Sequence, residues 1–81
     1  MKINDSKGNI TSYGLACGYV QSYLDKDYTF KVELSREHNT YHVKRYDYRP
    51  ENPGPICGLW ETFDTLTEAR KLYNEIKRDL K

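Results

Sequence analysis

Apolar and polar positions alternate over several segments of this chain. Near residue 65 the alternation gives way to the spacing of an amphipathic helix. The clearest alternation is YTFKVELSR (28–36), where apolar residues occupy every second position: Tyr28, Phe30, Val32 and Leu34. A period of two residues is typical of a strand that buries one face. The segment is therefore predicted to be a strand with one face toward the core.

The segment 13–23 shows a second alternation. Its larger side chains fall on one side: Tyr13, Leu15, Cys17, Tyr19 and Tyr23. We predict a strand here, because Gly18 is unfavourable in a helix interior and tyrosine favours strands. A helix remains the alternative, since Leu15, Tyr19 and Tyr23 also repeat at intervals of four.

The residues between positions 36 and 41 predict a tight hairpin. His38 and Asn39 are its two central residues, so that Glu37 faces Thr40. Asparagine tolerates the left-handed backbone that a two-residue turn requires. This turn sets the register of the strand that follows.

That next strand, YHVKRYDYR (41–49), carries an interruption in its alternation. An unbroken register puts Arg45 opposite Val32 and Asp47 opposite Phe30, which places two charges on the face that carries the core. Burying charges is costly unless they are paired. We expect a bulge at Lys44-Arg45, which returns the two following tyrosines to the core face. The alternative is the unbroken register, in which those tyrosines face solvent.

The remaining chain predicts a loop, a short strand and a helix. The segment 49–58 holds three prolines and two glycines and is predicted to be irregular. LWETFD (59–64) is predicted to be a fourth strand. Thr65 and Glu68 have capping-box spacing at the start of a helix over 65–81. One apolar stripe follows this helix: Leu66, Ala69, Leu72, Tyr73, Ile76 and Leu80. Basic residues favour its C-terminal end: Lys77, Arg78 and Lys81.

These elements predict an α+β fold: a small antiparallel sheet of about four strands with one C-terminal amphipathic helix packed on one face. A chain of 81 residues is long enough for one core only. Residues 1–12 are polar and are expected to form a flexible arm. Residues 13–81 are expected to form a single α+β domain.

Charge and cysteine content narrow the functional classes. The chain has 13 basic and 12 acidic residues, a net charge of +1, which argues against a duplex-DNA binder. It has no apolar run of the roughly 20 residues that a membrane span needs, and its first ten residues do not resemble a signal peptide. We therefore expect a cytoplasmic protein with Cys17 and Cys57 reduced. A Cys17–Cys57 disulfide is the alternative.

Residues with catalytic or metal-binding chemistry are few and scattered. The candidate zinc ligands do not form the usual close cysteine pairs: Cys17, His38, His42 and Cys57. Glu61 and Asp64 are the only close candidates for a catalytic pair of carboxylates, and no phosphate-binding glycine motif is present. We therefore expect no metal, no cofactor and no enzymatic activity.

Aromatic residues are the most informative feature for function. Eight tyrosines, two phenylalanines and one tryptophan exceed what a core under one helix can enclose. Tyrosine, tryptophan and arginine dominate the energetics of protein interfaces, which predicts a recognition face. The alternative is an ordinary surface on which amphipathic tyrosines are partly exposed. The candidate binding residues are Lys44, Arg45, Tyr46, Tyr48, Arg49 and Trp60. A protein partner is expected. The alternative is single-stranded nucleic acid, with bases stacked on the rings and phosphates neutralised by Lys44, Arg45 and Arg49.

Three segments carry a resemblance to known proteins: CGYVQSYL, EHNTYHVKRYDY and WETFDTLTEARKLYNEI. Together they resemble small uncharacterised proteins of bacteriophages and mobile elements, a group that includes anti-CRISPR and other anti-defence proteins. The resemblance covers roughly residues 13 to 78. It implies a phage-encoded, non-enzymatic inhibitor that blocks a host defence protein by occupying its surface.

Overall fold

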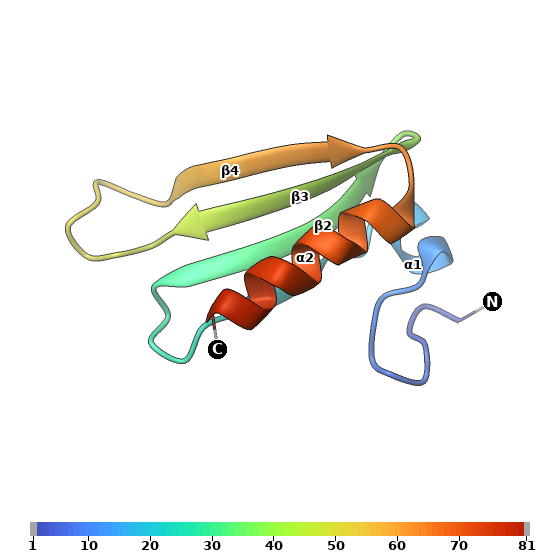
Figure 1. Ribbon diagram of the computed structural model, residues 1–81, viewed down its shortest axis with the longest axis horizontal. Helices are drawn as coiled ribbons and strands as arrows, with labels where there is room; N and C mark the ends of the chain where they lie inside the picture. The colour runs from blue at the N-terminus through green and yellow to red at the C-terminus, as the bar shows by residue number, and fades with distance from the viewer. Residues whose placement is uncertain (1, 81) are drawn as a thin grey trace.

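The computed structural model describes residues 2–80; residues 1 and 81 lie outside the described part of the chain. Its elements are α1 (Ser12–Ala16), β1 (Gln21–Leu24), β2 (Phe30–Glu37), β3 (Thr40–Asp47), β4 (Ile56–Phe63) and α2 (Leu66–Leu80). The strands form one antiparallel sheet in chain order, and α2 lies across one face of it (Figure 1). The predicted α+β class is confirmed.

The β2–β3 hairpin turns where the sequence predicted. Its ladder runs from the pair Glu37–Thr40 at the turn to the pair Phe30–Asp47 at the far end. The residue with a left-handed backbone is His38, with φ at 57°, and not Asn39 as expected. The Arg36 side chain closes the turn, because its guanidinium donates to the His38 carbonyl (3.0 Å) and to Asn39 Oδ1 (3.1 Å).

The bulge expected at Lys44-Arg45 is wrong for the β2–β3 pairing. Arg45 pairs with Val32 in an unbroken ladder, so the register keeps Tyr46 on the face opposite to the core. The irregularity lies instead between β3 and β4, where Arg45 pairs with Leu59 but Tyr46 pairs with Cys57. Gly58 is therefore the extra residue. Since β4 is an edge strand, a bulge there disturbs one ladder, whereas a bulge in the central strand β3 would disturb two.

The strand predicted over 13–23 is wrong in its first half, where the chain forms α1. Thr11 caps this short helix by accepting a hydrogen bond from the Gly14 amide (3.1 Å). Gly18, with φ at 97°, ends the helical turn, and the Tyr19 amide donates to the Gly14 carbonyl (3.1 Å). Gly18 therefore terminates a helix, and β1 begins only at Gln21.

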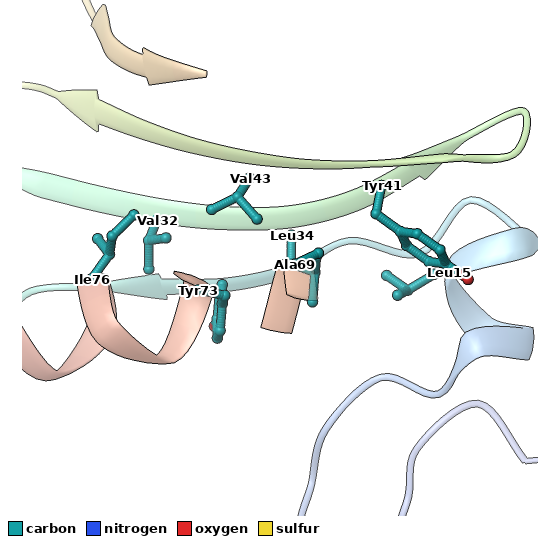
Figure 2. Close-up of a cluster of buried hydrophobic side chains, with 8 residues drawn as sticks. All are labelled: Leu15, Val32, Leu34, Tyr41, Val43, Ala69, Tyr73 and Ile76. Carbon is teal, nitrogen blue, oxygen red and sulfur yellow. The ribbon is translucent and has the colours of Figure 1, made fainter. Parts of the chain in front are cut away.

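The core lies between α2 and the sheet, and α1 closes one end of it. Its fully or nearly fully buried residues come from four elements, α1, β2, β3 and α2: Leu15, Val32, Leu34, Tyr41, Val43, Ala69, Tyr73 and Ile76. Figure 2 shows Leu15 and Tyr41 together at the α1 end and Ile76 beside Val32 at the other. The predicted apolar stripe of the C-terminal helix supplies three of these residues, and its other members pack against them: Leu66, Leu72 and Leu80.

The start of α2 is capped by the predicted pair, with one change in detail. The Glu68 amide donates to Thr65 Oγ1 (3.3 Å), as a capping box requires. The Glu68 carboxylate accepts from the Thr65 hydroxyl (2.9 Å) instead of from a backbone amide. The two side chains are therefore still hydrogen-bonded to each other at the start of α2, just after the end of β4.

The polar N-terminal segment folds back on itself. The Asp5 carboxylate accepts hydrogen bonds from the Lys7 and Asn9 amides, and an isolated bridge pairs Asn4 with Ile10. The Ile10 amide donates to Gln21 Oε1 (3.0 Å), which ties this loop to the first residue of β1. The flexibility expected of residues 1–12 stays a prediction about their motion in solution.

The turn between β1 and β2 is organised by one buried carboxylate. Asp25 is only 9% exposed. Its carboxylate accepts hydrogen bonds from Thr29 Oγ1 (2.6 Å) and from the amides of Thr29 (2.7 Å) and Phe30 (3.0 Å). The Thr29 hydroxyl makes the largest contribution to lowering the pKa of Asp25 below its usual value. The same turn holds Tyr28 with φ at 59°, an unusual backbone for an aromatic residue.

We predict that the two faces of the sheet differ sharply in their sensitivity to truncation. Leu34→Ala empties a position with no solvent exposure and should lower the free energy of unfolding by about 2–5 kcal/mol. Leu24→Ala makes the same chemical change at a residue that is 39% exposed and should cost about 0.5 kcal/mol or less. Urea unfolding of both variants measures the difference. Equal losses would contradict the assignment of the faces.

We predict that Asp25 makes stability depend on pH in the acid range. A carboxyl whose pKa is lowered in the folded state stabilises the protein above its unfolded pKa, and this contribution is lost as the pH falls through the folded value. Asp25→Asn should therefore lower the melting temperature at neutral pH, and the difference from the wild type should shrink progressively as the pH falls below about 4. A melting-temperature difference between wild type and variant that stays constant from pH 7 to pH 3 would contradict this role.

Candidate functional site

The face of the sheet turned away from α2 carries a group of aromatic and charged side chains, here called the open face. Its members are Lys31, Glu33, His42, Lys44, Tyr46, Tyr48 and Trp60. Six of them lie on three neighbouring strands, because alternate residues of β2, β3 and β4 point to the same side, and Tyr48 directly follows β3. α2 covers the opposite face, so these side chains are not needed to close the core.

Trp60 is the most prominent member of the open face, with 59% of its surface exposed. Its indole Nε1–H donates to His42 Nδ1 (2.9 Å), which leaves the other nitrogen of the imidazole to carry the proton. The Lys44 ammonium lies 4.4 Å from the centre of the Trp60 ring system. One hydrogen bond and one cation–π contact therefore hold the exposed indole in a defined orientation.

Two tyrosines form the second part of the open face. The rings of Tyr46 and Tyr48 lie 6.1 Å apart, and the Lys31 ammonium lies 5.6 Å from the centre of each. Lys31 also forms a 2.7 Å ion pair with Glu33, which raises the pKa of Lys31. The lysine is thus a fixed positive charge between two rings, and its charge is balanced by a neighbouring carboxylate.

The structure divides the six predicted binding residues between the two faces of the sheet. Lys44, Tyr46, Tyr48 and Trp60 share the open face. Arg45 and Arg49 lie on the other side, where their guanidinium carbons are 4.3 and 5.7 Å from the centre of the Phe30 ring.

Phe30 and Asp47 explain how the helix-side face accommodates these arginines. Arg45 covers the Phe30 ring, and Arg49 forms a 2.8 Å ion pair with Asp47, which lowers the pKa of that carboxyl. Arg45 and Asp47 are half-buried, and Arg49 is exposed. The charges on this face are therefore stacked on a ring or paired with an opposite charge near the end of the β2–β3 ladder, and no bulge is needed there.

Sequence reasoning missed three members of the open face: Lys31, Glu33 and His42. The unbroken register contained the signal for them, since it pairs Lys31 with Tyr46 and Glu33 with Lys44. The contact of His42 with Trp60 depends on the pairing of β3 with β4, which the proline-rich loop before β4 conceals in the sequence.

Other chemistry is sparse in residues 2–80. No group of three or more histidine, cysteine or acidic residues there could hold a metal ion. Cys17 and Cys57 are both free and exposed, so the structure contains no bridge between them. Two hollows of about 340 Å³ each lie along α2, and one of them is lined by Phe63, Glu68, Lys71, Leu72 and Glu75. In the same part of the chain, no helix has the length and apolar character to cross a membrane.

Comparison with known proteins adds no identification: no family model, no curated protein and no solved structure matches the chain. The resemblance to phage anti-defence proteins therefore stays a prediction.

We predict that His42 controls the fluorescence of Trp60, the only tryptophan in the chain. The imidazole of His42 accepts the hydrogen bond from the indole, so a side chain without an acceptor nitrogen at this position removes that bond. His42→Phe should therefore shift the emission maximum of Trp60 at constant pH. His38→Asn, at the other histidine, should leave the emission as in the wild type; the same shift in this control would contradict the assignment.

Proposed function

We propose that this chain is a small, non-enzymatic binding protein that recognises a protein partner through its open face. The observation that carries the proposal is the set of aromatic rings held outside the core: Tyr46, Tyr48 and Trp60. Aromatic side chains with restrained orientations offer large contact areas at a low entropic cost, which is typical of interface hot spots. The hydrogen bond to His42 and the contacts with Lys31 and Lys44 supply that restraint.

The distribution of charge favours a protein over a nucleic acid as the partner. Binding to single strands uses a continuous basic track beside the stacking rings. The open face has two lysines, of which Lys31 is paired with Glu33. Arg45 and Arg49, which the nucleic-acid alternative requires, contact Phe30 on the other side of the sheet. A face with rings and nearly balanced charge suits a protein surface better.

Occlusion is the mode of action that fits a contact surface of this kind. A protein that covers part of its partner's surface needs shape, rings and hydrogen bonds, which the open face offers. The resemblance to phage proteins extends this proposal to an inhibitor of a host defence protein, acting in the host cytoplasm.

The proposal is tested by capturing partners from a bacterial lysate with the tagged chain as bait. Trp60→Ala and Tyr46→Ala should each reduce recovery of a specific protein by roughly tenfold or more, as expected for hot-spot residues. Tyr13→Ala is the matched aromatic control, because Tyr13 is 44% exposed and lies on α1, away from the open face. Thermal unfolding should remain close to that of the wild type in all three variants.

A second pair of variants separates the two classes of partner. Lys44 and Arg45 are neighbours in sequence but lie on opposite faces. Lys44→Ser should weaken a protein complex of the open face, whereas Arg45→Ser should leave it intact. Nucleic-acid binding predicts that both variants, and Arg49→Ser, weaken binding of a single-stranded oligonucleotide in a strongly salt-dependent manner. That second outcome would contradict the proposal.

A further inference from the structure

The two edge strands of the sheet, β1 and β4, differ in length and in what lies beside them. β1, at one edge, has four residues, and the folded N-terminal loop is tied to its first residue, Gln21. The Gln21 side chain accepts from the Ile10 amide (3.0 Å) and donates to Asn9 Oδ1 (2.9 Å). A short strand beside a loop offers little backbone for pairing with another chain.

The opposite edge is long and open. β4 has eight residues, Ile56–Phe63, and only Leu59 and Phe63 are half-buried while the others are exposed. Its only strand neighbour is β3, and within residues 2–80 no other segment forms a backbone hydrogen bond with it. Figure 1 shows β4 at the margin of the sheet, with α2 running away from it toward the other edge. Such an edge presents unpaired amides and carbonyls to an incoming strand.

We propose that the β4 edge accepts an extended strand of the partner protein, with basic side chains toward α2 and apolar side chains toward the open face. This inference rests on the proposed function and names the way the partner is held. Main-chain hydrogen bonds to an edge give affinity, and alternate side chains give specificity, in known cases of strand addition.

Charge beside the β4 edge indicates the basic character of the incoming strand. Glu61 is exposed and lies on the helix side of β4, as the partner of the core residue Val43. The adjoining hollow has two more acids, Glu68 and Glu75, against one base, Lys71. None of these three acids forms an ion pair with a described residue. A strand with lysine or arginine on this side complements the acidic excess.

A second copy of this chain fits the edge poorly. β4 contains no lysine or arginine, so an antiparallel pair of β4 strands offers Glu61 no cation from the opposing strand. A pair centred on Glu61 would bring two carboxylates opposite each other, which is destabilising. An inward-pointing charge on an edge strand is also a common means of preventing self-pairing. The acid that disfavours a copy of β4 is the one that attracts a basic strand.

The open-face side of the same edge supplies the apolar contact. Trp60 lies at the centre of β4 and is 59% exposed, so apolar side chains of an added strand pack beside its ring. Because an added strand would pack beside Trp60, the fluorescence of this residue reports strand addition directly.

The test uses synthetic peptides of alternating valine and lysine, capped at both ends and matched to the eight residues of β4. Binding is measured by Trp60 fluorescence and by the amide shifts of β4. Alternate amides of a strand point to the same side, so N-methylation of the valines or of the lysines blocks opposite edges. One methylated peptide should bind roughly tenfold or more weakly than the parent, and the other should bind about as well.

Charge specificity is tested with a valine–glutamate peptide and with Glu61→Lys. The wild type should prefer the lysine peptide by roughly tenfold, and Glu61→Lys should reverse that preference. Glu37→Lys makes the same charge change in the hairpin, away from β4, and should leave the preference unchanged.

Three outcomes would overturn the inference: absence of binding at millimolar peptide, equal binding of both methylated peptides, or a preference that Glu61→Lys does not alter. A dimer of the chain alone, with β4 amides protected from exchange, would overturn it too, because a second copy would then occupy the edge. In each case, loss of partner capture with Trp60→Ala would still support the open face as the surface that contacts the partner. Strand addition without an effect of Trp60→Ala or Tyr46→Ala on capture would count against the open face alone.

Discussion

The two-residue turn at His38-Asn39 fixes which side chains of β2 and β3 share a face, and the remaining structure depends on that register. Glu37 pairs with Thr40, and each later pair follows without interruption as far as Phe30 and Asp47. Because successive residues of a strand point to opposite sides, a shift by one residue would exchange the two faces beyond it. The unbroken ladder puts Val32, Leu34 and Val43 under α2 and leaves Tyr46 and Lys44 outside.

Charges on the helix-side face are tolerated because of where they lie and what they contact. Arg45 covers the ring of Phe30, and Asp47 is paired with Arg49, so neither charge lies unpaired inside the core. The chain still contains one bulge beside Arg45, but Gly58 of the edge strand is the extra residue. The irregularity therefore disturbs only the β3–β4 ladder, and the β2–β3 hairpin keeps its register.

The sequence was sufficient to predict the elements whose causes are local. The alternation of residues 30–36, the turn at His38-Asn39 and the stripe of the C-terminal helix each specify one structure, and these predictions are confirmed. Tyr28, which the alternation placed on the core face, lies instead in the turn before β2 and is 72% exposed. The strand predicted over 13–23 is wrong in its first half, because Gly18 ends a helical turn and does not lie inside an element. Whether charges on the core face are covered depends on tertiary placement, which local patterns do not contain.

The candidate site was predictable to the extent that it follows from this register. Tyr46, Tyr48, Lys44 and Trp60 were identified by residue type, and the unbroken register, when followed, adds Lys31 and Glu33. Arg45 and Arg49 were grouped with them because they are close in sequence, although the sheet separates the two sets. His42 required the pairing of β3 with β4, which the loop of residues 48–55 does not reveal.

The most direct test of this account is the cross-strand proton pattern of the β2–β3 ladder, measured by NMR. Antiparallel strands give short contacts between α-protons at alternate, non-hydrogen-bonded pairs. The unbroken register predicts that these contacts continue on both sides of Lys44, with Arg45 opposite Val32 and Asp47 opposite Phe30. A shift of partners by one residue beyond Lys44, with Tyr46 opposite Val32, would contradict the account and return the tyrosines to the core face.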